Sequence, residues 1–230
     1  LPAGWPRLAA AALAIVAPLR ALGGTLARGT AADESAIERY ALDLLHSPEP
    51  DTPAIVLGTD DHRSFGVLWA QQVLGAAPHV IYIDASLLQQ RWYRVRLQRL
   101  LPPGLADLAE IDKPVAWLGA LWQHEQGRAL PVYLANDFSV PSTTLPRVPQ
   151  GVAWRVLAPW EQGLGPEQVL ARHLAARARL LGPPAQLHSP FASDLAASYA
   201  EIEGKLARAL AAAGRRDLLA QLQAADAAAP

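Results

Sequence analysis

The apolar residues of this chain fall into short runs separated by stretches of helical spacing. Residues 54–57 and 79–84 are short runs of aliphatic and β-branched side chains, which is the pattern of buried strands. Residues 33–45 and 64–74 instead place apolar side chains three and four positions apart, which predicts helices. This alternation of helix and strand predicts a parallel sheet with crossover helices.

The same alternation continues further along the chain. Residues 86–101 and 115–126 predict two more helices. Residues 131–136 and 151–159 predict two more strands, and the proline-rich stretch at residues 138–150 predicts a loop between them. The first of these two helices has a basic face that carries Arg91, Arg94 and Arg99.

From Pro166 onward the pattern is helical. Three helices are predicted, at residues 166–181, 193–214 and 215–229. Pro166 suits the first turn of a helix and Gly214 is a stop signal. The sequence therefore predicts an α/β fold, in which a small, mostly parallel sheet is flanked by helices and followed by an all-helical C-terminal segment.

The beginning of the chain contains a different kind of segment. Residues 8–19 are apolar, but this stretch is shorter than the roughly 20 residues that span a bilayer. We expect residues 1–30 to form the end of a membrane or membrane-surface helix and a linker; an alanine-rich packing helix is the alternative. Residues 31–160 would then form an α/β domain and residues 161–230 the C-terminal helices. Since the chain contains no methionine, we expect a piece of a longer or processed protein.

Charge and composition exclude several classes of protein. The 20 Lys and Arg residues and 21 Asp and Glu residues are spread along the chain, whereas a nucleic-acid partner needs a concentrated basic stripe. The lack of cysteine excludes disulfides and thiolate metal sites. The sequence contains no dinucleotide fingerprint, phosphate-binding loop or nucleophile elbow, so no resident cofactor is expected. Abundant Ala, Arg, Leu and Pro with little Lys suggest a GC-rich bacterial genome.

Polar residues follow the predicted parallel strands. Ligands of parallel α/β sheets bind beyond the carboxyl ends of the strands, so these residues are candidates for a binding site. The candidates are Asp60, Asp61, His62, Ser64, Asp84, Ser86, Asn136 and Asp137. Their oxygen atoms could hold a divalent cation or form hydrogen bonds with sugar hydroxyls. The alternative is that the Asp and Ser residues only cap the helices that follow the strands.

Trp92 and Tyr93 are two further candidate binding residues. Adjacent residues of a helix point about 100° apart, so these two side chains cannot both face one core. We expect Trp92 to be buried and Tyr93 to lie near a surface. An exposed Trp92 close to the acidic strand ends would instead suit stacking on the apolar face of a sugar ring.

A family resemblance rests on residues 56–100, which read VLGTDDHRSFGVLWAQQVLGAAPHVIYIDASLLQQRWYRVRLQRL. This block resembles the stretch after the last membrane helix in the domain-of-unknown-function 2723 family, polytopic proteins associated with transmembrane-protein-260-like protein O-mannosyltransferases. The shared positions are Asp61, Ser64, Phe65, Leu68, Trp69, Gln71, Pro78, Val80, Ser86, Leu87, Leu88, Trp92 and Tyr93. The similarity covers most of residues 32–160, but the turn departs from the family at His62 and Arg63.

This resemblance implies an extracytoplasmic C-terminal domain of a glycosyltransferase-like protein of the bacterial inner membrane, on the periplasmic side. The family's lipid-phosphate-sugar chemistry is expected in an early loop between membrane helices, outside this chain. The domain would then bind an acceptor polypeptide or glycan, or cap the membrane region of the same polypeptide, without a complete active site. Two alternatives remain open: a soluble α/β enzyme or metal-binding domain that uses the strand-end carboxylates, and a protein-interaction scaffold.

Overall fold

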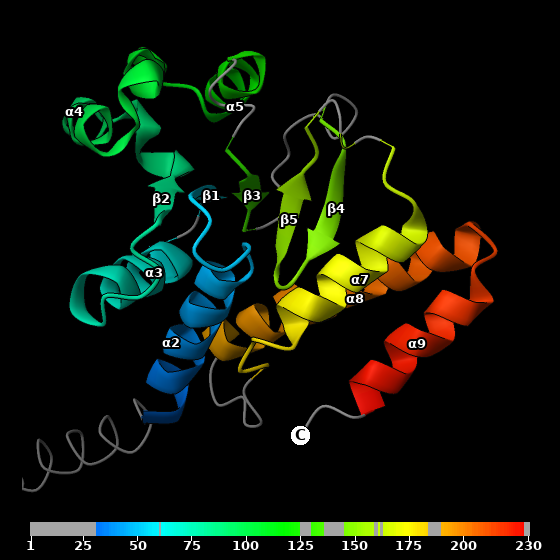
Figure 1. The fold of residues 1–230 in the computed structure, drawn as a ribbon. Coiled ribbons are helices and arrows are strands. Elements are labelled where there is room, and N and C mark those ends of the chain that lie inside the picture. Colours follow the sequence, from blue (N-terminus) through cyan, green and yellow to red (C-terminus); the bar gives the residue numbers. More distant parts are fainter. Residues whose placement is uncertain are drawn as a thin grey trace, which may run out of the picture.

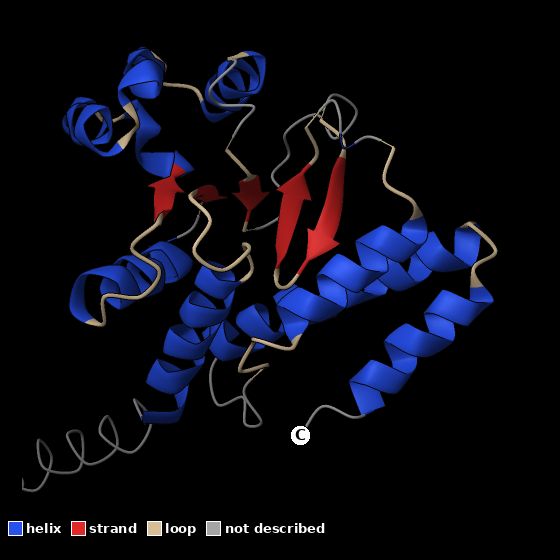
Figure 2. Cartoon of the chain, in the orientation of Figure 1, coloured by secondary structure: helices blue, strands red, loops and turns tan. Residues whose placement is uncertain are grey.

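The computed structural model describes residues 31–59, 61–124, 130–135, 145–158, 161, 163–183 and 190–227; the side chains of residues 31–35, 62 and 191 are outside this description. A five-stranded sheet lies between two layers of helices (Figures 1 and 2). The predicted α/β class, with helices on the sheet and a helical C-terminal segment, is therefore confirmed.

The sheet is mixed, with strand order β2-β1-β3-β5-β4. Its strands are β1 (Ala54–Gly58), β2 (Val80–Asp84), β3 (Val132–Leu134), β4 (Arg147–Gln150) and β5 (Ala153–Val156). Strand β1 pairs in parallel with both β2 and β3, as predicted. Strand β5 runs antiparallel to β3, and β4 and β5 form an antiparallel hairpin at the edge.

Strand β4 corrects one expectation, because the prediction placed a loop over residues 138–150. The last four of these residues pair with β5, and Pro149 lies opposite Trp154. A proline lacks the N–H that a central strand needs, but it is tolerated in an edge strand such as β4. The hairpin turns at Gly151, whose φ of 62° favours glycine. A Cβ atom at this position would also lie only 2.4 Å from the hydroxyl oxygen of Ser47, so a larger residue does not fit.

One face of the sheet is covered by helices α2 (Ala31–His46), α3 (Asp61–Val73), α7 (Pro166–Arg177) and α8 (Pro190–Ala212). Helices α2 and α3 pack on each other, and Val56 of β1 shares their core with Tyr40, Leu44 and Leu195. Helix α3 begins at Asp61, three residues before the predicted start at residue 64.

The opposite face is covered by the 3-10 helices η1 (Ala85–Gln89) and η2 (Pro103–Glu110) and by helices α4 (Arg91–Leu100) and α5 (Pro114–Gln123). Ile55 and Leu57 of β1 point to this side, where they share a core with Tyr93 and Trp117. The single helix predicted over residues 86–101 is thus two elements, because the backbone at Gln90 is extended and ends η1 before α4 begins.

The C-terminal helices are α7, α8 and α9 (Arg216–Ala227), in agreement with the prediction of three helices. Helices α7 and α8 contact β4, and α8 also contacts α2. Because Leu195 and Tyr199 of α8 share a core with Tyr40 of α2, the helical segment is packed directly on the α/β part. The domain boundary at residue 160 stays a prediction.

The described ranges contain no helix with both the length and the apolar character needed to cross a bilayer. The predicted membrane-proximal segment, residues 1–30, lies outside the described residues.

Candidate functional site

The carboxyl ends of β1 and β2 lie at the same edge of the sheet. The two strands are in register, with Gly58 of β1 opposite Asp84 of β2. Asp61 opens α3 just after β1 and is exposed, so the structure brings residues from both strand ends to one edge, as predicted. Three of the predicted site residues, Asp60, Asn136 and Asp137, and the side chain of His62 lie outside the described residues.

Asp84 acts as a helix cap in this structure. Its buried carboxylate accepts hydrogen bonds from the backbone N–H of Ser86 at 2.9 Å and from the Ser86 hydroxyl at 2.5 Å. These contacts close the first turn of η1, which is the capping role that the sequence left as the alternative. In the part of the chain that the structure describes, no three His, Asp or Glu side chains are grouped to hold a metal ion.

Ser64 is also committed to an internal contact. Its buried hydroxyl lies 2.9 Å from the hydroxyl of Tyr82 on β2. Tyr82 in turn crosses the end of β1, because a Cβ built on Gly58 would lie only 1.9 Å from the Tyr82 hydroxyl oxygen. Glycine at this strand end therefore makes room for the tyrosine that holds the first turn of α3 to the sheet.

The expectation for the aromatic pair was wrong in its direction: Tyr93 is only 2% exposed, whereas Trp92 is 60% exposed. The two rings meet edge to face with centroids 5.6 Å apart. Tyr93 is the buried member because its hydroxyl accepts a hydrogen bond from the backbone N–H of Asp84 at 2.8 Å. Burial raises the pKa of Tyr93 to about 12, so its hydroxyl stays protonated at neutral pH.

The basic face of α4 differs from the predicted one in one residue. Arg94 is half-buried and donates a hydrogen bond of 2.8 Å to the carbonyl oxygen of Leu88, so it fastens α4 to η1. Arg96, which the prediction omitted, is exposed together with Arg91 and Arg99. The helix begins at Arg91 and not at residue 86, and the burial of Tyr93 and Leu97 leaves the three exposed arginines on its outer side.

Arg63 has a role that sequence analysis missed. The sequence places it in a polar turn, but it lies in the first turn of α3 and is buried. Its guanidinium donates to a carboxylate oxygen of Asp194 at 3.1 Å and to the hydroxyl of Ser198 at 2.8 Å, both on α8. It also lies 5.6 Å from the ring centroid of Tyr40. Arg63 therefore ties α2, α3 and α8 together, and its two partners on α8 are more than a hundred residues away.

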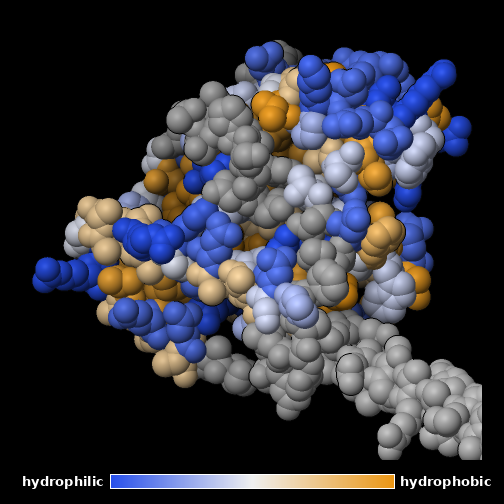
Figure 3. All heavy atoms as spheres, turned by 180° about the vertical axis from the view of Figure 1, so that it is seen from behind, coloured by the Kyte–Doolittle hydropathy of each residue, from blue (hydrophilic) through white to orange (hydrophobic). Residues whose placement is uncertain are grey.

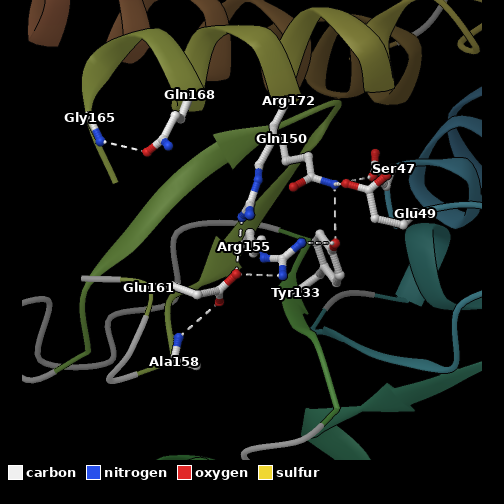
Figure 4. Close-up of polar contacts among 10 residues, drawn as sticks. All are labelled: Ser47, Glu49, Tyr133, Gln150, Arg155, Ala158, Glu161, Gly165, Gln168 and Arg172. Atoms are coloured by element: carbon white, nitrogen blue, oxygen red, sulfur yellow. Dashed lines mark hydrogen bonds and ion pairs between the residues drawn. The ribbon is translucent and has the colours of Figure 1, made fainter. Parts of the chain in front are cut away.

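A second polar cluster, here called the α7–sheet network, joins α7 to the sheet (Figure 4). Its members are Ser47, Glu49, Tyr133, Gln150, Arg155, Glu161 and Arg172. Glu161 accepts hydrogen bonds from Arg155 of β5 at 2.8 Å and from Arg172 of α7 at 3.0 Å. Burial alone would raise the pKa of Glu161, but the N–H of Ala158 and the two guanidinium groups outweigh it and lower the pKa.

The other half of the network centres on Tyr133 of β3. Its hydroxyl accepts hydrogen bonds from Gln150 at 3.1 Å and from Arg155 at 3.2 Å, and burial raises its pKa. Gln150 also donates to the carbonyl oxygen of Ser47 at 3.0 Å. A tyrosine with a raised pKa remains protonated and is a poor general base, so these contacts serve to hold β3, β4, β5 and the residue after α2 together. No local motif in the sequence signals this cluster, because its members are far apart along the chain.

No family model, curated protein or solved structure matches this chain. The resemblance to the membrane glycosyltransferase-like family consequently stays a proposal.

At the strand-end edge, most of the candidate polar groups are used inside the fold. Asp84 caps η1, Ser64 contacts Tyr82, and Tyr93 is bonded to the backbone of Asp84. Of the predicted residues whose side chains are described, Asp61, Ser86 and Trp92 are exposed, and the Ser86 hydroxyl is bonded to Asp84. An acidic side chain and a large exposed aromatic ring favour ligand binding over acid–base catalysis at this edge.

Proposed function

We propose that this chain is a ligand-binding extracytoplasmic domain of a glycosyltransferase-like membrane protein, and that it binds an acceptor glycan or glycopeptide without a complete active site of its own. The observation that carries the proposal is the exposure of Trp92 on a well-anchored helix. A tryptophan ring that is 60% exposed leaves a large apolar surface in water, which suits stacking against a sugar ring. Tyr93 is bonded to the end of β2 and Arg94 to η1, and these two contacts fasten the helix that carries the ring.

The membrane context of the proposal comes from the sequence. The resemblance over residues 32–160 and the apolar residues 8–19 support a polytopic parent of the protein O-mannosyltransferase type, with this domain on the periplasmic side of a bacterial inner membrane. A sugar donor linked to a lipid meets its catalytic acid at the membrane surface. The isolated chain should therefore transfer no sugar from polyprenyl-phosphate-mannose.

An apolar stripe on α3 supports a further role that we propose for this domain, contact with the membrane region of the same polypeptide. Phe65, Trp69 and Val73 are four residues apart and are 70%, 42% and 65% exposed. The stripe lies beside α2, since a Cβ built on Gly66 would be 2.6 Å from the side chain of Ile37. The N-terminal half of α2 thus lies close to an apolar face that a neighbouring hydrophobic segment could cover.

Calorimetric titration of the chain with a mannosyl glycopeptide tests the glycan-binding role. We expect saturable binding that Trp92→Ala abolishes while the circular dichroism spectrum is unchanged. Trp69→Ala is the matched control, because Trp69 is also an exposed tryptophan but lies on α3. If the wild-type chain releases no heat of binding, a binding site at Trp92 is rejected. The same holds if Trp69→Ala abolishes binding as fully as Trp92→Ala.

A further inference from the structure

The outward face of α4 combines the exposed tryptophan with a concentration of positive charge. Arg91, Trp92, Val95, Arg96 and Arg99 are all exposed, whereas Tyr93 and Leu97 on the opposite side are buried. With about 100° between successive residues, these five exposed positions fall on one side of the helix. In the space-filling view from behind, hydrophilic side chains with hydrophobic ones among them cover this end of the molecule (Figure 3, upper right).

No described carboxylate pairs with the arginines on this face of α4. Helix α4 contains four arginines and no acidic residue, although the whole chain has a net charge of −1. Within the part of the chain that the structure describes, Arg91, Arg96 and Arg99 form no ion pair. The carboxylate of Glu110 on the neighbouring η2 accepts a hydrogen bond of 2.7 Å from Gln98 and not from an arginine.

The spacing of the face favours an extended ligand with regularly placed anionic groups. Arg96 and Arg99 follow Trp92 by four and seven residues, which places them about 6 Å and 10 Å further along the helix axis. A guanidinium group binds a carboxylate or a phosphate through two parallel hydrogen bonds, and it loses less hydration energy than an ammonium group. An aromatic ring followed by two such groups can hold a sugar ring and the charged substituents of its neighbours.

We propose that the ligand of the α4 face is an anionic glycan, whose sugar ring stacks on Trp92 and whose carboxylate or phosphate groups pair with Arg96 and Arg99. This inference rests on the proposed glycan-binding function and specifies the chemical class of the ligand. A bilayer surface is less well supported as the occupant, because α4 and the first turn of α2 lie at opposite ends of the molecule (Figure 1). A membrane that holds the segment before α2 would then be remote from α4.

Titration of the full chain with matched oligosaccharides tests the inference. The probes are hexagalacturonate, which carries a carboxylate on every sugar, and uncharged mannohexaose of the same length. We expect a dissociation constant at least tenfold lower for hexagalacturonate, and weaker binding as the salt concentration rises. The double variant Arg96→Gln/Arg99→Gln should lose at least tenfold in affinity for hexagalacturonate and keep the wild-type affinity for mannohexaose. Arg208→Gln, at an exposed arginine of α8, is the control and should leave both affinities unchanged.

The outcomes separate this inference from the proposed function. Equal binding of both oligosaccharides, lost in Trp92→Ala but not in the arginine variant, would overturn the anionic class and leave the glycan-binding function intact. Binding of neither would overturn both. Binding of single-stranded DNA or of phosphatidylglycerol vesicles as tightly as hexagalacturonate, through the same two arginines, would show a general polyanion surface and would also overturn the inference.

Discussion

The hydroxyl of Tyr93 accepts a hydrogen bond of 2.8 Å from the backbone N–H of Asp84, which joins the first turn of α4 to the last residue of β2. The same Asp84 caps η1 through its carboxylate, so one residue organises the whole connection from strand to helix. Because Tyr93 is fixed in this way, the neighbouring Trp92 is turned outward. The candidate binding surface of α4 is thus set by a contact between a buried side chain and a strand end.

Tyr93→Phe tests this contact. The variant removes the hydroxyl but keeps the ring, and it leaves the buried N–H of Asp84 without its partner. We expect the free energy of unfolding to fall by about 1–3 kcal/mol in urea denaturation, since an unsatisfied buried donor costs this much. Trp92→Phe, a comparable change at the exposed neighbour, should alter stability by less than about 0.5 kcal/mol. An equal loss in the two variants would contradict the assignment of Tyr93 as the anchor.

Local pattern was enough to predict much of the fold. The aliphatic runs of β1 and β2 and the helical spacing of α7 to α9 are strong signals that depend on few long-range contacts. Strand β4 has no such signal, because its residues Arg147–Gln150 contain a proline and no apolar run. It is a strand only because β5 supplies the pairing partner.

The candidate site was predictable in position but not in detail. Parallel strands place their carboxyl ends together, so Asp61 and Asp84 were expected at one edge, and both are found there. The choice between Trp92 and Tyr93 for burial depended on the extended backbone at Gln90 and on the hydrogen bond from the Asp84 N–H to the Tyr93 hydroxyl, neither of which the sequence shows. Arg63 finds its partners on α8, far along the chain.

Glu161 should make stability depend on acid pH. Its pKa is lowered from the ordinary value of 4.5 in the folded chain, so its contribution is present above that value and is lost as the pH falls through the folded-state pKa. Glu161→Gln leaves the nearly buried Arg155 without a counter-charge, and we expect a loss of about 2–3 kcal/mol at pH 7. As the pH falls below the folded-state pKa of Glu161, the two proteins should converge in urea titrations, because the wild-type carboxyl is then protonated as well.

Glu167 provides a matched control for that measurement. Its pKa is also lowered, chiefly by hydrogen bonds from its own backbone N–H and from Arg215, but its carboxylate is fully exposed. Glu167→Gln should change the stability and its pH dependence very little, because exposed ion pairs are screened by water and salt. A pH profile of Glu161→Gln parallel to that of the wild-type chain would show that Glu161 has an ordinary pKa and no special role in the α7–sheet network.

Gly58 should be the least replaceable glycine at the strand-end edge. A methyl group there would lie 1.9 Å from the hydroxyl oxygen and 2.8 Å from the ring of Tyr82. Tyr82 cannot easily move away, because its hydroxyl contacts Ser64 and its ring is buried in the core. We expect Gly58→Ala to lower the free energy of unfolding by about 2–3 kcal/mol, as overpacking does in other cores. In a Tyr82→Phe background the same change should cost at least about 1 kcal/mol less, because the closest clashing atom is absent.

Gly119→Ala is the control for Gly58→Ala. Gly119 lies in the interior of α5 with no atom within 4 Å of the new methyl group, so this change should stabilise the chain by about 0.5–1 kcal/mol. Additive effects of Gly58→Ala and Tyr82→Phe would show that the new methyl group and the Tyr82 hydroxyl do not meet at the end of β1.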